Sequence, residues 1–278
     1  MDKRVSVIIP NFNYGRFLES AIQSVINQSY QNVEIIVIDD GSTDNSRLIL
    51  ESYGSTIKTL FQNNQGQAIA RNNGIAIAEG ELIALLDADD YWEPSKLERQ
   101  IELINDNFEF IYTGLRQFNN DSGVTINSVF PSFSGDCRMS FIDYPSRAIV
   151  PGGESSALFT RSLFDKVGNF DPMLSTASGR DFYRRCSKYT KFSFVNELLI
   201  NYRSHNSNMS RNSVSSMADT AKAYLRLFED PEWKFARKYK RRCLTRLHWS
   251  FFKTSVKNQD LAGAMRNLFA LSNSLFGH

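Results

Sequence analysis

The sequence is poor in the residues that build disulfide frameworks and zinc sites. Only three cysteines and three histidines occur among its 278 residues. Cys137, Cys186 and Cys243 lie far apart and form no CxxC pair. This spacing excludes a disulfide scaffold and a Cys-rich structural zinc site, and it suits a reducing compartment. Three histidines are also too few for a His-rich metal site.

Long apolar runs are missing as well. No stretch reaches the roughly 18 apolar residues that a membrane-spanning helix needs. The run Val5–Ile9 is too short for a signal peptide and is followed at once by Pro10. The net charge of +2 gives no reason to expect nucleic acid as a partner. We therefore expect a cytoplasmic protein, with peripheral contact to the inner face of a membrane as its only lipid interaction.

Three common phosphate-binding and hydrolase motifs are absent. The first apolar run is not followed by GxGxxG, and GxxxxGK[ST] occurs nowhere. Dinucleotide-binding and P-loop proteins are thereby excluded, because both cradle phosphate with these loops. No GxSxG motif is present to serve as the nucleophile turn of an α/β-hydrolase.

The first hundred residues alternate between apolar runs and helical patterns. The runs Val5–Ile9, Val33–Ile38, Ile57–Phe61 and Leu82–Leu86 are continuously apolar, as expected of strands buried on both faces. Apolar residues at helical spacing lie between these runs and also after Pro94. This alternation predicts βαβ units and a parallel sheet, so the fold class is α/β.

The pattern changes twice further along the chain. From about residue 108, short strand-like pieces are separated by polar loops, which predicts a mixed sheet. After residue 211 the pattern becomes helical. We expect a domain over residues 1–211, with a nucleotide-binding half at 1–107 and an acceptor-binding half at 108–211. Residues 212–278 would form a C-terminal helical extension.

Polar clusters follow three of the four predicted strands. Pro10-Asn11-Phe12-Asn13 follows the first, Asp39-Asp40-Gly41-Ser42 the second and Asp87-Ala88-Asp89-Asp90 the fourth. The carboxyl ends of parallel strands share one edge of a sheet, where ligands bind. Two of the clusters are acidic, and crowded carboxylates repel unless a cation neutralises them. Mg²⁺ or Mn²⁺ would do so and would bridge the carboxylates to phosphate oxygens.

Each acidic cluster also has a purely structural interpretation. Asp87–Asp90 could be an acidic turn that caps the next helix. The Asp39–Ser42 segment has the composition of an ordinary turn. The position of Asp87–Asp90 at the end of a buried strand favours the metal-binding interpretation.

Taken together, these segments resemble family 2 glycosyltransferases of the GT-A fold. The resemblance runs through Val5–Asn13, Val33–Asp44, Asn64–Asn72 and Leu86–Asp90 in order, covering about the first third of the chain. Weaker matches follow at Gly152–Phe159, Phe164–Asp171, Asp181–Arg185 and Tyr202–His205 with Asn208. The resemblance implies a Rossmann-like mixed sheet flanked by helices, as in nucleotide-diphospho-sugar transferases.

The resemblance also implies the roles of individual residues. A nucleotide-diphosphate sugar would be held by Pro10, Asn11, Asn13, Asp39, Asp40, Gly66, Arg71, Asp87 and Ala88. Asp89 would be the principal metal ligand, with Asp87 and His205 as further ligands. Arg71 would face the diphosphate, where a cation suits the charge. The alternatives are a solvated helix charge for Arg71 and a satisfied loop histidine for His205.

The catalytic base is where this sequence departs from the family pattern. Inverting members deprotonate the acceptor hydroxyl with a carboxylate from an acidic pair that precedes an aspartate-led helix. Here Ser178 and Gly179 stand at the pair. Asp181 is the first candidate for the base, although its position equally suits a helix cap. Glu154 is the second candidate.

The resemblance predicts a metal-dependent, inverting hexosyltransferase. The donor would be a UDP-sugar, and the acceptor a carbohydrate or lipid-linked glycan used in cell-surface polysaccharide synthesis. Two alternatives stay open. Loss of the acidic pair could leave a nucleotide-sugar-binding scaffold without turnover. A sugar nucleotidyltransferase would share the fold but needs a glycine-rich basic loop after the first strand, which Pro10–Gly15 does not supply.

The segment Trp233–Trp249 combines basic and aromatic residues. Its cations could meet anionic lipid while the aromatic rings enter the membrane surface. Alternatively, the segment is an amphipathic helix that packs its rings on the body of the protein. The spread of charges around the helix slightly favours the second interpretation.

Overall fold

Four apolar runs of the first hundred residues form the parallel part of one sheet. The strands are β1 (Val5–Asn11), β2 (Val33–Asp39), β3 (Lys58–Phe61) and β4 (Leu82–Leu85). They lie in the order β3-β2-β1-β4 and are all parallel. In β1, Val7 and Ile8 point to opposite faces and belong to different apolar clusters. Burial on both faces explains the continuous apolar runs of β1, β2 and β4, as predicted. The prediction was wrong for β3, which lies at the edge of the sheet and is only partly buried, with Phe61 40% exposed.

The computed structural model describes residues 3–142, 150–208, 213–257 and 259–276. The helices of the first half are α1 (Gly15–Ile26), α2 (Ser46–Ser52), α3 (Gln67–Ala76) and α4 (Lys96–Ile101), and a 3₁₀ turn, η1, spans Gly54–Thr56. Helix α1 buries Leu18, Ala21 and Ile22 against the β1 side chains of its cluster. Helix α3 packs on the cluster of the other face.

The second half completes a mixed sheet. Its strands are β5 (Tyr91–Trp92), β6 (Phe110–Asn119), β7 (Thr125–Val129), β8 (Leu158–Thr160) and β9 (Phe192–Ser204). The full order is β3-β2-β1-β4-β8-β6-β9-β5, with β7 beside β6. Strand β8 is antiparallel to both β4 and β6, which confirms the predicted change from parallel to mixed pairing. The helical segments here are α5 (Arg138–Ile142), η2 (Gly153–Ser156), α6 (Arg161–Val167) and α7 (Ser178–Cys186).

Strands β6 and β9, of 10 and 13 residues, are longer than the short strand-like pieces expected in this half of the chain. They pair in parallel from Phe110 to Asn119, with register shifts around Gly114. Leu115 and Ile200, just beyond these shifts, still pack in the core, and the side chains become mostly polar and only partly buried from Arg116 and Tyr202 onward, although the backbone ladder continues. The extension carries Arg203 and Ser204 to the rim of the sheet.

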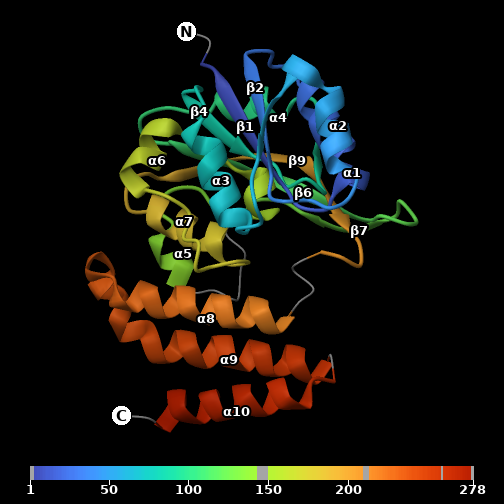
Figure 1. The fold of residues 1–278 in the computed structure, drawn as a ribbon. Coiled ribbons are helices and arrows are strands. Elements are labelled where there is room, and N and C mark those ends of the chain that lie inside the picture. The colour runs from blue at the N-terminus through green and yellow to red at the C-terminus, as the bar shows by residue number, and fades with distance from the viewer. Residues whose placement is uncertain (1–2, 143–149, 209–212, 258, 277–278) are drawn as a thin grey trace.

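The chain ends in three helices stacked below the sheet (Figure 1). These are α8 (Ser213–Glu229), α9 (Lys240–Lys257) and α10 (Leu261–Phe276), with a 3₁₀ segment η4 (Pro231–Tyr239) before α9. Tyr224, Trp233 and Leu247 belong to the same apolar cluster as the sheet residues Phe110 and Phe159. The helical extension thus shares the core of the body, while the expected boundary at residue 211 lies outside the described residues and stays a prediction.

Two features bear on the predicted membrane contact. Trp233 is 0% exposed and packs in the core, so it does not contribute to a surface. None of the helices in the described parts of the chain is long and apolar enough to cross a membrane.

A buried carboxylate organises the amino-terminal end of the sheet. Glu34 Oε1 accepts hydrogen bonds from Ser6 Oγ and from the backbone N–H groups of Glu79 and Gly80. Its Oε2 accepts from Lys58 Nζ at 2.9 Å. Burial alone would raise the pKa of Glu34, but these hydrogen bonds outweigh it and hold the pKa below its usual value.

We predict that Glu34→Gln destabilises the protein by about 1–3 kcal/mol at pH 7, because buried donors lose their charged acceptor. A lowered carboxylate pKa stabilises the fold above the unfolded-state pKa of about 4.3 and ceases to do so as pH falls through the folded-state value. The difference between wild type and variant should therefore shrink on acidification. Urea unfolding at pH 7 and pH 4 measures it. Glu102→Gln, at an exposed ion pair, is the control, and equal stability of Glu34→Gln and wild type at pH 7 would refute this account.

Candidate functional site

The ends of β1 and β2 are joined by polar side chains. Asn11 lies opposite Asp39 in the parallel ladder. Its Nδ2 donates to Asp39 Oδ2 at 2.8 Å, and Ser42 N donates to Asp39 Oδ1 at 2.9 Å. Asn11 Oδ1 is buried without a hydrogen-bond partner. A covered acceptor without a protein partner therefore lies beside a buried carboxylate at this edge, with Pro10 preceding Asn11 in β1.

Asn13, Asp40 and Gly66 hold the loops around this edge. Asn13 adopts a left-handed φ of 58°, which asparagine tolerates, and its Oδ1 accepts from Thr43 N at 2.7 Å. Asp40 accepts from the backbone N–H groups of Gln65 and Gly66, both at 2.8 Å. Gly66, at φ 90°, starts α3. The carboxylate of Asp40 is thus used to shape the loop before α3, and its predicted nucleotide contact stays a prediction.

The aspartates after β4 have different surroundings. Asp90 Oδ2 accepts from Ser155 Oγ at 2.7 Å, and its Oδ1 accepts from Arg203 N at 3.1 Å. Burial, followed by the charges of Asp89 and Asp87, raises the pKa of Asp90 well above its usual value. Ala88 packs into the core. Asp90 and Ala88 therefore anchor the segment, while Asp87 keeps a partly exposed side chain and Asp89 is nearly buried.

Arg71 joins Asp87 to Glu154. The arginine is 1% exposed, and its Nη2 donates to Asp87 Oδ1 at 2.8 Å. Its Nη1 lies 3.0 Å from Glu154 Oε1, an ion pair by distance that lacks the alignment of a hydrogen bond. Burial raises the pKa of Asp87 to about 6 against the lowering effect of Arg71, with Glu154 and Asp89 adding to the rise. Arg71 is thus a buried partner of two carboxylates rather than a solvated helix charge.

Asp89 is covered by the segment that follows β9. His205 Nε2 lies 3.0 Å from Asp89 Oδ2, and Asn208 Nδ2 donates to the same oxygen at 3.1 Å. Ser207 holds the other ring nitrogen of His205, at 2.9 Å from Nδ1. Tyr14, which precedes α1, donates its hydroxyl to Ser207 O at 3.0 Å. The loop is therefore fastened to the β1 end of the sheet as well as to Asp89.

The arrangement brings together two of the three predicted metal ligands. Asp89 and His205 are in contact, whereas Asp87 is paired with Arg71. Within the described residues, no three His, Cys, Asp or Glu side chains form a preassembled metal cage. Mg²⁺ and Mn²⁺ sites that also take phosphate and water ligands need only one or two carboxylates from the protein. The oxygen-rich donor set and the mutual repulsion of Asp87, Asp89 and Asp90 fit such a cation.

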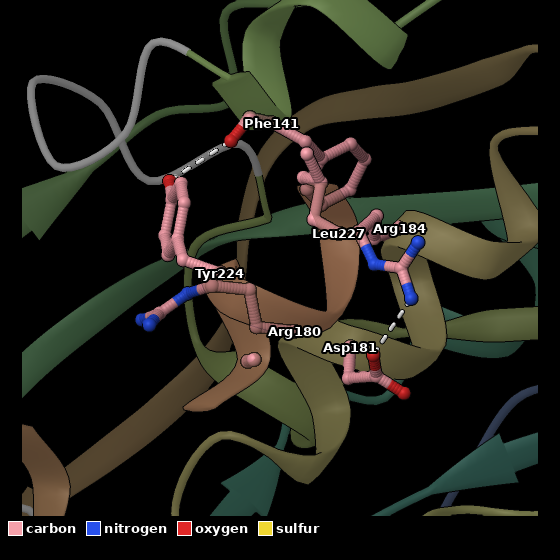
Figure 2. A pocket seen from close by; sticks show the side chains of 7 residues that line it. Phe141, Arg180, Asp181, Arg184, Tyr224 and Leu227 are labelled. Carbon is pink, nitrogen blue, oxygen red and sulfur yellow. Dashed lines mark hydrogen bonds and ion pairs between the residues drawn. The ribbon is translucent and has the colours of Figure 1, made fainter. Parts of the chain in front are cut away.

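Asp181, the first candidate for the base, is held by arginines. Its two oxygens accept from Arg184 at 2.9 Å and from Arg185 at 2.8 Å. Figure 2 shows its carboxylate facing Arg184 beside Tyr224 and Leu227 of α8. The cavity here is about 10 Å³, room for about one water molecule. Asp181 is thus paired within α7, and it is Arg184 that also donates to Asp230, just after α8, at 3.1 Å.

Glu154, the second candidate, lies against Gly179. A Cβ atom placed on Gly179 would overlap Glu154 Oε1 and would lie 2.5 Å from the carboxyl carbon. The carboxylate of Glu154 therefore occupies the space that any side chain at position 179 would enter. Glu154 thus places a carboxylate beside Gly179, one of the two positions where the acidic pair of the family is missing.

The residues that fix the turn around Glu154 were not among the predicted site residues. Ser155 Oγ accepts from Asp87 N at 3.1 Å while donating to Asp90, and Ser155 O accepts from Trp92 Nε1 at 2.9 Å. Tyr14 was missed as well. A serine in a glycine turn gives no signal for partners more than 60 residues away, and only the fold brings them together.

Comparison with known proteins places the chain in a family. A family model described as Glycosyl transferase family 2 matches residues 6–168. An uncharacterized glycosyltransferase of Nostoc sp. is 34% identical over 226 residues, which are 78% of this chain and 69% of that protein. The Escherichia coli protein WfgD, a UDP-Glc:α-D-GlcNAc-diphosphoundecaprenol β-1,3-glucosyltransferase, is 41% identical over 124 residues, 44% of this chain and 49% of WfgD.

Among solved structures, S. aureus TarS 1–349 in complex with UDP-GlcNAc has a TM-score of 0.71 at 17% identity, covering 98% of this chain and 81% of TarS 1–349. At this identity the likeness shows the fold. The family model covers more than half of the chain, so the protein belongs to glycosyl transferase family 2 and is a glycosyltransferase of the GT-A fold.

Proposed function

We propose that the protein transfers a sugar from a UDP-sugar to a hydroxyl group of a lipid-linked glycan, with inversion at the anomeric carbon. The observation that carries the proposal is the Arg71 pair, which holds Glu154 and Asp87 at the edge that also presents Asn11 and Asp39. This edge combines polar side chains that suit a nucleotide, carboxylates that suit a divalent cation, and a candidate base.

The donor side rests on Asn11 and Asp39. The Oδ1 of Asn11 lacks a partner in the protein and is covered, so a shift of this side chain would let it accept an N–H of a pyrimidine base. Pro10 and Asn13 frame the same edge, and Gly66 starts the helix that carries Arg71. The UDP-linked substrates named for WfgD and TarS support a uridine donor here.

A divalent cation, Mg²⁺ or Mn²⁺, would be held by Asp89, with Asp87 and His205 as further ligands. When bound, it would neutralise charge on the diphosphate. Asn208 and Ser207 orient His205, and the Tyr14 hydrogen bond keeps this loop over the site. Arg71, which is paired with Asp87, would offset part of the negative charge of the site that the cation leaves unneutralised.

Glu154 is the proposed base. Its carboxylate would take the proton of the acceptor hydroxyl as that oxygen bonds to the anomeric carbon and the diphosphate leaves from the opposite face. Arg71 fixes its orientation, and the bonds from Ser155 hold its turn. Asp181 is less suited, because both its oxygens accept from arginines against α8. Glu154 also weighs against the scaffold alternative, since it would supply a carboxylate where the acidic pair is missing.

A turnover assay tests the proposal. The protein is incubated with UDP-Glc, UDP-GlcNAc or GDP-Man, a short-chain lipid-diphosphate sugar and Mn²⁺. We expect one UDP-sugar to yield UDP and a glycosylated acceptor in equal amounts, with inverted anomeric configuration. Pyrophosphate release would indicate the nucleotidyltransferase alternative, and donor binding without turnover on any acceptor would indicate the scaffold.

We predict that Glu154→Gln lowers kcat by about 10²–10⁴-fold, the usual contribution of general base catalysis, with little change in donor affinity. Asp181→Asn should leave kcat within about threefold while lowering Tm, because its arginine partners lose a buried charge. Steady-state kinetics and thermal unfolding of both variants check this. The opposite pattern would move the base to Asp181.

The contact between Gly179 and Glu154 gives a sharper prediction. Gly179→Ala removes no functional group, yet its methyl group must displace the Glu154 carboxylate, so kcat should fall by at least about tenfold. Because Gly179 lies within helix α7, alanine should not destabilise the fold. Combining it with Glu154→Asp, whose shorter side chain makes room, should recover part of kcat. Wild-type kcat in Gly179→Ala would show that the Glu154 position does not matter.

A further inference from the structure

The charge of the chain is divided unevenly between body and C-terminal helices. Residues 234–278 contain ten Lys and Arg and one Asp. Because the whole chain has a net charge of +2, residues 1–233 carry a net charge of −7. The cations are concentrated before and along α9, and these nine side chains are all exposed: Lys234, Arg237, Lys238, Lys240, Arg241, Arg242, Arg246, Lys253 and Lys257.

Helix α10 carries an exposed apolar face. It packs on α9 through its buried Gly263 and Ala264, and Figure 1 shows it as the layer farthest from the sheet. On its other side, Leu261 is 80% exposed, Met265 67%, Leu268 48% and Phe269 71%. Spacings of three and four residues place these side chains along one face of the helix.

Two further apolar side chains are exposed on α9. Trp249 is half exposed and stacks on Phe252 with ring centroids 5.4 Å apart, and Val256 lies one turn past Lys253. Large apolar residues are thus exposed at six positions between 249 and 269, on helices that also carry the basic side chains. An apolar stripe on the outer layer of a protein marks an interaction surface.

We infer that α9 and α10 form a surface that binds an anionic lipid membrane. Exposed basic residues beside an apolar helix face are the combination that interfacial helices use, since the cations meet lipid phosphates while the apolar side chains enter the headgroup boundary. A second copy of this chain fits less well, because a symmetric contact would oppose the same cations. Nucleic acid would match the charges and leave the α10 face uncovered. This surface, rather than Trp233–Trp249 alone, would meet the membrane.

Vesicle sedimentation tests the inference. The full chain is mixed at about 0.1 M salt with phosphatidylcholine vesicles, either pure or containing phosphatidylglycerol. We expect at least tenfold stronger binding to the anionic vesicles, reduced again by high salt. Met265→Ser with Phe269→Ser, and separately Lys253→Glu with Lys257→Glu, should each weaken binding at least tenfold.

Matched controls lie on the body of the protein. Leu48→Ser with Ile77→Ser changes two exposed apolar residues, and Lys3→Glu with Lys191→Glu changes two lysines; both should bind like wild type. Circular dichroism shows that each variant is folded. No binding to anionic vesicles, or equal binding by the α10 variant, overturns the inference, as does a dimer in sedimentation equilibrium that the α10 variant dissociates. The assay uses no catalysis, so its failure would leave the proposed transfer reaction standing.

Discussion

The site depends on one buried arginine. Arg71 belongs to α3 and is buried, and its guanidinium pairs with Asp87, which follows β4, and with Glu154 in η2. Two carboxylates this close to the interior would repel each other without a shared cation. The next residue in α3, Asn72, exchanges two hydrogen bonds with the backbone of Phe170, which fixes the approach to α7. Helix α3 thereby connects the donor edge, through Arg71, with the segment that precedes α7, through Asn72.

The acidic residues of the site divide into structural and chemical groups. Asp40, Asp90 and Asp181 have their oxygens filled by loop N–H groups, by Ser155 and Arg203, or by arginines. Asp87 and Asp89 each use one oxygen, toward Arg71 and toward His205 with Asn208, and Glu154 lies against Gly179. A sequence motif shows how many carboxylates are present, but not which of their oxygens accept hydrogen bonds within the fold. Only the hydrogen-bond partners therefore distinguish the carboxylates available for chemistry from those that hold the fold together.

The first half of the fold was predictable because strands buried on both faces, such as β1, β2 and β4, have continuously apolar sequences. The strand-end clusters followed from parallel topology. Strand β5, with two residues, and the polar extensions of β6 and β9 carry no such signal. The meeting of Glu154 with Gly179 was also invisible, since these residues are separated by α6 and joined only through packing. The sequence left open whether Trp233 meets a membrane surface or packs on the body, because composition does not reveal which aromatic ring enters the core.

The central claim is that this edge binds a nucleotide diphosphate with a divalent cation. Calorimetry with UDP, GDP and dTDP, each in Mn²⁺ and in EDTA, tests it most directly on the wild type and on Asp89→Asn. The account predicts that UDP binds, that EDTA weakens binding at least tenfold, and that Asp89→Asn removes this metal dependence while the protein stays folded. If no nucleotide binds with or without Mn²⁺, the account of this edge as a donor site is wrong.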